Sequence, residues 1–469
     1  MNETLGASLE AILAAVATRT VSAADLAETH LAALERISGP LNAVARLEPE
    51  AARAGAQALD RRLAAGEPVG PLAGAPLAHK DLYDRAGRLS EAGSRILAGR
   101  VAETTAHAVT RLDAADALDL GRLNTVEFAL GTEGRNIHTG PPRNPWNTAH
   151  STGGSSSGSG AAVASGAIPA AMGSDTGGSI RLPAAACGLV GLKPTAGRVG
   201  RSGIFPLSGS LDTAGPLCRT VRDTALMLCA LAGPDPADPQ SVDAPFGDPL
   251  AGIEDGYEGL RFGVARSYFF DPVTTTVGAR LEAAIAAMAS EGAAIRDVAL
   301  PGIEVANRLT LTMIAVEASA QHREWLATRA ADYGAETLTR LVGGAFVPAQ
   351  AYLAAVMHRR TLLAAALAGP FAEVDIVATP AWPMEVPQIV PYNTPGFAGK
   401  VSDSGHCSRP FNFLGLPALV LPVGLDGNGV PVAIQLVARP FAERKLLRAA
   451  RALERTLRFH ESHRPTVTA

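Results

Sequence analysis

Apolar positions over residues 1–70 recur at the spacing of three and four residues that is typical of amphipathic helices. Leu9 and Val16 fall on one face of a first helix, and Ser22 is a suitable cap for the start of a second. A third helix is expected over 48–65 because Gly66 and Pro68 follow it. This pattern predicts a helical layer that packs on the rest of the chain.

Beyond this layer, short apolar runs typical of buried strands alternate with helical stretches. Strands are expected within 71–81, 117–123, 260–265, 293–300, 374–380, 411–424 and 430–438, and helices over 103–118, 220–233, 275–292, 303–330, 350–368 and 443–457. Glycine and proline are frequent in 192–217 and 380–406, so both stretches are expected to be irregular. The alternation predicts an α/β protein with a largely buried sheet and helices on both faces.

No clean boundary divides the 469 residues into independent domains. We expect one large domain with four parts: a helical layer over 1–70, a core over 71–232, a variable substrate-side region over 233–406, and closing strands and a helix over 407–469. Hydrophobic residues make up 47% of the chain and charged residues 18%, which is enough for a sizeable core.

Charge and targeting signals bear on location and partners. The formal net charge is −4 and no block of like charges forms a basic patch, which disfavours a dedicated nucleic-acid surface. The N-terminal stretch lacks the basic start of a signal peptide, and no long uncharged apolar run predicts a membrane span. These patterns favour a cytoplasmic protein with no membrane or nucleic-acid partner.

No pattern indicates a cofactor or a metal. The ten histidines are scattered, the four cysteines form no CxxC pair, and no phosphate-binding glycine motif follows a strand. The cysteines are therefore expected to be reduced and mostly buried, and a protein without a cofactor is expected.

The glycine- and serine-rich segment 151–195 is the candidate for chemistry, since its polar turns are framed by apolar runs and no flexible linker has that pattern. Within it, Gly154 to Gly158 fits GxSxG, the nucleophile elbow of α/β-hydrolases. That motif should follow a strand, whereas a loop precedes it here, so the elbow is the weaker interpretation.

A combination of Lys80, Ser155 and Ser179 offers a better route to a serine nucleophile. A serine hydroxyl needs a base, and lysine can be one if burial lowers its pKa from about 10.4. Lys80 ends an apolar run, and Asp81 beside it would point to the opposite face. Taken alone, Lys80 would be better explained as a surface or ion-paired lysine, and the Gly-Gly-Ser turn is also common as a helix cap. Their occurrence together favours the catalytic interpretation.

Several motifs occur together and resemble one family. They are PLAHKDLYD around Lys80, GRLNTVEFALG, NPWNTAHSTGGSSSGSGAAVASG, GSDTGGSIRLPAAACGLVGLKPTAGRVGRSG, SLDTAGPLCRTVRDTALML and FNFLGLPALVLPVG. Together they are similar to the amidase signature family of serine hydrolases. The resemblance is dense over 71–232 and weak over 235–405, and it departs from the family pattern at Ser157, where glycine is usual.

The resemblance implies a mixed sheet and a residue set. Ser179 would be the nucleophile, Ser155 a bridging serine after a cis peptide bond, and Lys80 the base. The backbone amides of Thr176, Gly177, Gly178 and Ser179 would form the oxyanion hole. The residues implied to hold this loop are Ser156, Asp175 and Arg181.

Three functions are compatible with these residues. The first is an amide hydrolase, with ester or carbamate (urethane) activity through the same acyl-enzyme, acting on a small molecule as a monomer or homodimer. The second is the glutaminase subunit of a tRNA-dependent amidotransferase, although 400–417 lacks the acidic, tyrosine-containing stretch expected there. The third, a silent binding scaffold, is disfavoured because all three catalytic positions are present.

The substrate pocket is the least defined part of the sequence. Phe128, Phe205 and Trp382 are candidate substrate contacts, and their apolar character favours aryl or alkyl amides over highly charged ones. Each of them could instead belong to the core.

Overall fold

A computed structural model describes residues 4–244, 246–248, 250–390 and 404–469. Its core is an eleven-stranded mixed sheet in the order β1-β3-β2-β4-β6-β5-β10-β11-β9-β7-β8. The strands are β1 (Val44–Leu47), β2 (Pro76–Lys80), β3 (Leu118–Leu123), β4 (Ala170–Asp175), β5 (Val190–Lys193), β6 (Thr213–Cys218), β7 (Arg261–Ala265), β8 (Ala294–Val298), β9 (Ile376–Pro380), β10 (Ala418–Leu425) and β11 (Pro431–Ala438). The predicted α/β architecture is confirmed.

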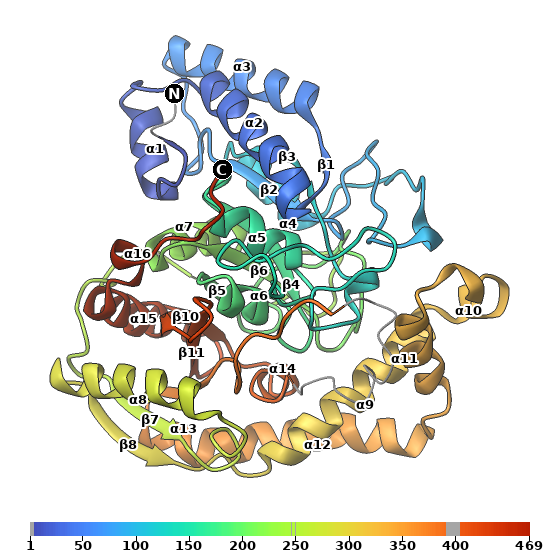
Figure 1. The fold of residues 1–469 in the computed structure, drawn as a ribbon, viewed down its shortest axis with the longest axis vertical. Coiled ribbons are helices and arrows are strands. Elements are labelled where there is room, and N and C mark those ends of the chain that lie inside the picture. Colours follow the sequence, from blue (N-terminus) through green and yellow to red (C-terminus); the bar gives the residue numbers. More distant parts are fainter. Residues whose placement is uncertain (1–3, 245, 249, 391–403) are drawn as a thin grey trace.

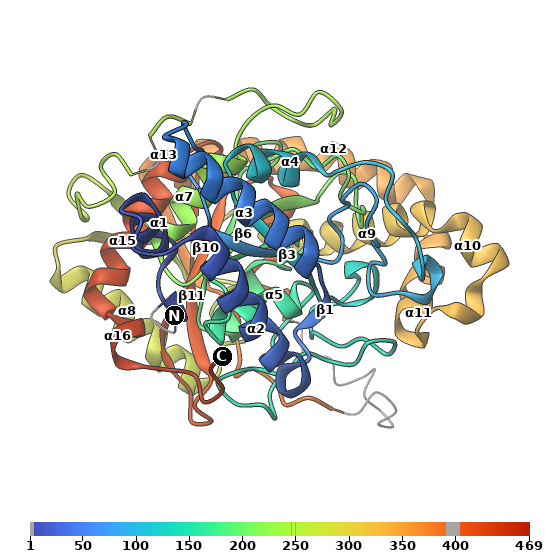
Figure 2. The ribbon, with the colours of Figure 1, turned by 90° about the horizontal axis from the view of Figure 1, so that it is seen from above.

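Helices cover both faces of the sheet (Figures 1 and 2). They are α1 (Leu9–Ala17), α2 (Ala23–Leu41), α3 (Pro49–Ala65), α4 (His107–Ala114), α5 (Ser157–Ala164), α6 (Arg181–Ala186), α7 (Val221–Leu231), α8 (Thr275–Ser290), α9 (Ile303–Gln321), α10 (Arg323–Thr328), α11 (Ala335–Ala345), α12 (Ala349–Ala368), α13 (Pro370–Glu373), α14 (Arg409–Phe413), α15 (Glu443–Leu457) and α16 (Phe459–Ser462). Helices α9 to α12 gather on one side of the molecule, away from α1 to α3 (Figure 1).

Alternate strand residues serve different faces of the sheet. Leu419 and Leu421 of β10 join the apolar cluster that holds α7 and α15, whereas Val420 between them joins the cluster that holds α2, α5 and α6. This two-residue alternation places a continuous apolar core on each side of a buried sheet.

The order of the strands brings distant segments together. The C-terminal hairpin of β10 and β11 lies between β5 and β9, so it joins the strands of the first half of the chain to β7, β8 and β9. Parallel pairing of β2 with β4 sets Leu77 opposite Ala170 and His79 opposite Met172, and β6 runs antiparallel to β4 with Thr213 opposite Asp175. The end of β2, the end of β4 and the start of β6 therefore lie side by side, where these three central strands end.

The N-terminal helices follow the prediction, and Ser22 caps α2 by accepting a hydrogen bond from the amide of Asp25. The expected helix over 303–330 is instead divided at His322 into α9 and α10, and α11 was not predicted. Residues 391–403 of the loop expected over 380–406 lie outside the described part of the chain.

The prediction of irregular structure over 192–217 was wrong at its end, because β6 is a fully buried central strand. Its sequence, TAGPLC, contains the residues that disfavour strands. Gly215 is required there by close approach, since a Cβ at this position would collide with the backbone oxygen of Leu192. Sheet pairing on both sides overrides the local preference.

Among the described residues, no single helix has both the length and the apolar character needed to cross a membrane. Two helical stretches, Ala335–Ala345 and Ala349–Glu373, are long and apolar enough only when they are taken together, and a sharp bend separates them.

Truncating the core is expected to destabilise the fold measurably. Leu447 of α15 is fully buried in the main apolar cluster, so Leu447→Ala should lower the free energy of unfolding by about 3 kcal/mol through lost transfer energy and a cavity. Lys445→Ala, on the exposed side of the same helix, should cost at most about 1 kcal/mol. Equilibrium unfolding in denaturant measures both, and equal losses would contradict the assigned packing of α15.

Candidate active site

Lys80 lies at the end of β2, fully buried, with two hydroxyls around its ammonium group. Its Nζ donates to Ser155 Oγ at 2.6 Å and to Ser174 Oγ at 2.9 Å. The register of β2 with β4 explains the second contact, since Lys80 follows His79 and Ser174 lies two residues after its partner Met172. Asp81 turns away and contacts Arg46 at 3.3 Å, as the alternation of strand side chains predicts.

The environment of Lys80 suits a base. Burial lowers its pKa to about 7, against the opposing effect of the carboxylates of Asp212 and Asp175. A lysine in this state is partly neutral near neutral pH and can accept a proton from a hydroxyl.

Ser155 is held in place by its own backbone. The peptide bond from Gly154 to Ser155 is cis, as the family resemblance implies. The carbonyl of Ser155 accepts hydrogen bonds from Thr125 Oγ1 at 2.9 Å and from the amide of Val126 at 3.2 Å. The loop of Ser155 is tied to that of Ser179, since the amide of Ser156 donates to the Ser179 carbonyl at 3.2 Å.

The GxSxG alternative places its nucleophile at Ser156. In the structure the Ser156 hydroxyl contacts the backbone of Ser174 at 3.3 Å, as both donor and acceptor, and no strand leads into the motif. Ser156 therefore joins two loops.

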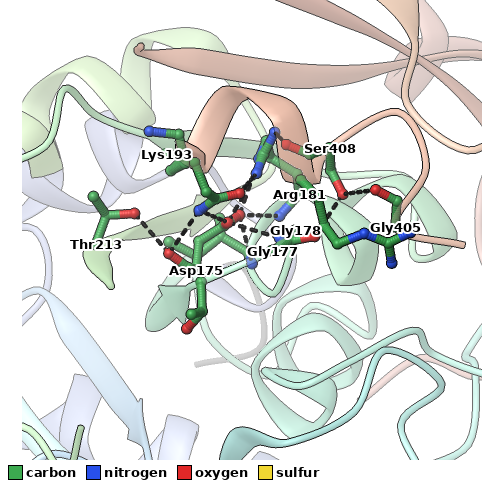
Figure 3. A network of polar contacts seen from close by, with 12 residues as sticks. Asp175, Gly177, Gly178, Arg181, Lys193, Thr213, Gly405 and Ser408 are labelled. Carbon is green, nitrogen blue, oxygen red and sulfur yellow. Dashed lines mark hydrogen bonds and ion pairs between the residues drawn. The ribbon is translucent and has the colours of Figure 1, made fainter. Parts of the chain in front are cut away.

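The turn that carries Ser179 is organised by Asp175 (Figure 3). The carboxylate of Asp175 accepts hydrogen bonds from the amides of Gly178, at 2.8 Å, and Ile180, at 3.1 Å. Gly178 has φ +127°, and a Cβ there would collide with Ser408 Oγ, so only glycine fits without displacing Ser408.

The four amides predicted to form the oxyanion hole are not equivalent. The Gly178 amide donates to Asp175, whereas those of Thr176, Gly177 and Ser179 have no protein acceptor among the described residues. Three N–H groups in one tight turn are thus available to an oxygen atom of a substrate.

Arg181 neutralises Asp175 and extends the network to the end of the chain. Its Nε and Nη2 donate to the two carboxylate oxygens at 3.0 and 2.9 Å. Although burial alone would raise the pKa of Asp175, this guanidinium holds it well below its usual range. Arg181 also donates to Asn412 Oδ1 at 2.5 Å and to Gln435 Oε1 at 2.7 Å. Nothing in the local sequence around 175–181 pointed to these two partners.

A cavity of about 530 Å³ borders Ser179. Its wall is formed by the 129–132 loop, by Thr176 and Gly177, by helices α9 and α11, and by Arg340 and Arg409. Among the described lining residues most are small or apolar.

None of the three predicted aromatic contacts is among the described residues that line this cavity. Phe128 is buried behind it, with its ring centroid 5.1 Å from that of Phe205. Phe205 lines a second cavity of about 360 Å³, which also includes Ser174. Trp382 packs against Leu182 in another apolar cluster. The described residues contain no cluster of His, Cys, Asp and Glu that could hold a metal.

The reactivity of Ser179 should follow the ionisation of Lys80. Because only neutral lysine accepts a proton, modification by a neutral sulfonyl fluoride should accelerate as the pH rises through about 7 and then level off. The rate constant of inactivation as a function of pH measures this. Lys80→Ala should be slow at every pH, and a wild-type midpoint near about 10.4, the ordinary lysine value, would contradict the assignment.

Breaking the buried ion pair should be costly. Arg181→Met leaves Asp175 buried without its counter-charge and should lower the free energy of unfolding by about 3–5 kcal/mol. Arg53→Ala, which breaks the exposed pair with Glu28, should leave the free energy of unfolding nearly unchanged, because solvent screens that pair. Denaturant unfolding compares the two, and pairing Arg181→Met with Asp175→Asn should recover part of the loss.

Comparison with known proteins agrees with these features. A family model described as Amidase matches residues 25–447. A glutamyl-tRNA(Gln) amidotransferase subunit of Geobacter sp. (strain M21) is 37% identical, over 95% of this chain and 96% of that protein. The corresponding subunit of Roseiflexus sp. (strain RS-1) is also 37% identical, over 94% of each chain.

Solved structures give the same picture. A chain of an inhibitor-bound vestigial protein complex, described as revealing the evolutionary origins of an s-triazine catabolic enzyme, superposes with a TM-score of 0.90 at 35% identity, covering 99% of this chain and all of that one. A bacterial aryl acylamidase of the amidase signature family has a TM-score of 0.90 at 28% identity, over 98% of both chains. The glutamyl-tRNA(Gln) amidotransferase subunit of Thermotoga maritima has a TM-score of 0.79 at 30% identity, over 96% of this chain and 94% of that one. This chain belongs to the amidase signature family.

Proposed function

We propose that this protein hydrolyses carboxylic amide bonds through an acyl-enzyme on Ser179. The observation that carries the proposal is the 2.6 Å contact between Lys80 Nζ and Ser155 Oγ, in a setting where burial lowers the lysine pKa to about 7. A base of that pKa next to a hydroxyl chain is what activation of a serine requires.

The first half-reaction forms the acyl-enzyme. Ser179 Oγ attacks the amide carbonyl carbon while its proton passes to Ser155, whose own proton passes to neutral Lys80. The carbonyl oxygen becomes an oxyanion, stabilised by the amides of Thr176, Gly177 and Ser179. The C–N bond then breaks, and the leaving amine takes a proton back from Lys80 through Ser155.

The second half-reaction releases the acid. Water attacks the ester carbonyl and loses its proton along the same path, and the C–O bond to Ser179 breaks as Ser179 regains a proton. Esters and carbamates have the same carbonyl chemistry, so the same residues serve them. Asp175, Ser156 and Arg181 hold the turn, and no step needs a cofactor.

For the substrate we favour small aryl or alkyl amides. Support comes from the mostly apolar cavity beside Ser179 and from the aryl acylamidase with a TM-score of 0.90. Phe128 and Phe205 then shape the cavity wall from behind, and Trp382 remains a weaker proposal.

Glutamine is the second candidate substrate. The curated relatives at 37% identity are named as subunits of a glutamyl-tRNA(Gln) amidotransferase, and Arg340 and Arg409 in the cavity wall suit a polar substrate. Under this alternative the protein would work with partner subunits and tRNA, so the prediction that nucleic acid is not a partner has no support from these relatives. A cytoplasmic location and a monomer or homodimer stay predictions.

A direct assay separates the candidates. The purified chain should hydrolyse a p-nitroanilide, with ammonia release from glutamine much slower. Ser179→Ala should reduce the rate on the order of 10⁴-fold or more, while Ser290→Ala on the surface of α8 should not change it. Glutamine hydrolysis alone, or only in the presence of amidotransferase partner subunits, would favour the second candidate.

Full activity in Ser179→Ala would exclude the mechanism that both substrates share. Labelling of Ser179 by a fluorophosphonate, located by mass spectrometry, gives the same answer without the natural substrate.

A further inference from the structure

Asp212 lies just before β6, and three donors converge on its carboxylate. Thr176 Oγ1 donates to Oδ1 at 2.5 Å, and the amides of Leu207 and Ser208 donate to Oδ2 at 2.9 and 3.0 Å. Burial raises the pKa of Asp212, and these three hydrogen bonds from neutral donors oppose that effect by stabilising the ionised form. Thr176 is the first residue of the turn that carries Ser179.

The charge of Asp212 has no counter-ion in direct contact among the described residues. Arg201 comes near it, but it donates to the backbone carbonyl of Asp212 at 3.2 Å and pairs through Nη2 with Asp238 at 2.7 Å. No salt bridge of Asp212 occurs in the described part of the chain. The hydrogen bonds of the Asp212 carboxylate therefore come from groups that leave its charge intact.

The other carboxylate near Lys80, that of Asp175, has a direct counter-ion. Asp175 is paired through both oxygens with Arg181, and Lys193 of β5 adds a second positive influence. Asp81, just after β2, and His79 on β2 are directed elsewhere, to Arg46 and Asp119 respectively. Of the two carboxylates that favour the ammonium form of Lys80, Asp212 is thus the one that forms no ion pair among the described residues.

Asp212 also shares a cavity with a direct neighbour of Lys80. The cavity of about 360 Å³ beside the sheet edge is lined by Asp212, Thr213 and Ser174, and Ser174 Oγ accepts the second hydrogen bond of the Lys80 ammonium group. Antiparallel pairing of β6 with β4 places Asp212 next to the end of β4.

We propose that Asp212 is a positioning residue with two effects. It fixes the start of the turn that carries Ser179 through Thr176, and its charge, which is in no ion pair among the described residues, favours the protonated form of Lys80. The inference rests on the proposed function, because Lys80 must be the base for this charge to matter. Burial competes with Asp212, and their balance sets the pH above which the serine is activated.

The two effects can be separated with two variants. Asp212→Asn removes the charge but keeps hydrogen-bonding groups, whereas Thr176→Val removes the hydroxyl contact and keeps the charge. The test measures the rate constant of inactivation by phenylmethanesulfonyl fluoride against pH for the full chain, with mass spectrometry to locate the label on Ser179.

The expected results differ in kind. In Asp212→Asn the midpoint should move to lower pH by about one unit, since losing a nearby anion disfavours the ammonium form. In Thr176→Val the midpoint should stay in place while the rate at high pH falls about tenfold or more, and Thr176→Ser should restore it. A residue with only a structural role would lower the rate without moving the midpoint.

Each failure has its own meaning. If the wild-type protein is not labelled at Ser179, the proposed function fails. If labelling occurs but Asp212→Asn leaves the midpoint unmoved, the role of the charge is overturned, and an unchanged rate in Thr176→Val overturns the role of the contact. Should Asp212→Asn not fold, the comparison of Thr176→Val with Thr176→Ser still tests whether the contact between Thr176 and Asp212 positions the turn.

Discussion

The buried ion pair between Asp175 and Arg181 is the interaction on which the site depends. Two charges removed from water are tolerated only when every donor and acceptor is used, and here the pair is completed by backbone amides of the Ser179 turn and by Asn412 and Gln435. The requirement for complete pairing gives the turn one conformation. In that conformation, Thr176, Gly177 and Ser179, whose amides have no protein acceptor among the described residues, line the cavity of about 530 Å³.

Burial acts differently on Lys80, whose charge is not neutralised by a counter-ion in direct contact. Its ammonium group is surrounded by hydroxyls, so desolvation is only partly offset and the lysine lies near the boundary between its two protonation states. Lys80 and Asp175 end the neighbouring strands β2 and β4. The charge of Asp175 is fully compensated by Arg181, whereas the ammonium group of Lys80 can release a proton. The parallel register of these strands is what makes this difference possible.

Much of this could be predicted from the sequence, because the chemistry lies in local motifs. Ser155 and Ser179 belong to short glycine-rich segments, Lys80 ends a short apolar run, and the N-terminal helices follow clear apolar periods. Ser174 could not be predicted as a partner of Lys80, since the contact depends on strand register. Asn412 and Gln435 lie far along the chain from Arg181, and β6 has a composition that argues against a strand. What was missed was determined by tertiary pairing.

The position of the C-terminal hairpin has a consequence for how the protein is made. β10 and β11 occupy the middle of the sheet, and the Arg181 network is completed by the Ser408 carbonyl and the side chains of Asn412 and Gln435. On the ribosome, the chain must therefore emerge as far as Gln435 before the turn that carries Ser179 can acquire all its partners. Lys80, Ser155 and Ser179 are synthesised more than 250 residues earlier, so their arrangement is completed by residues that are added long after them.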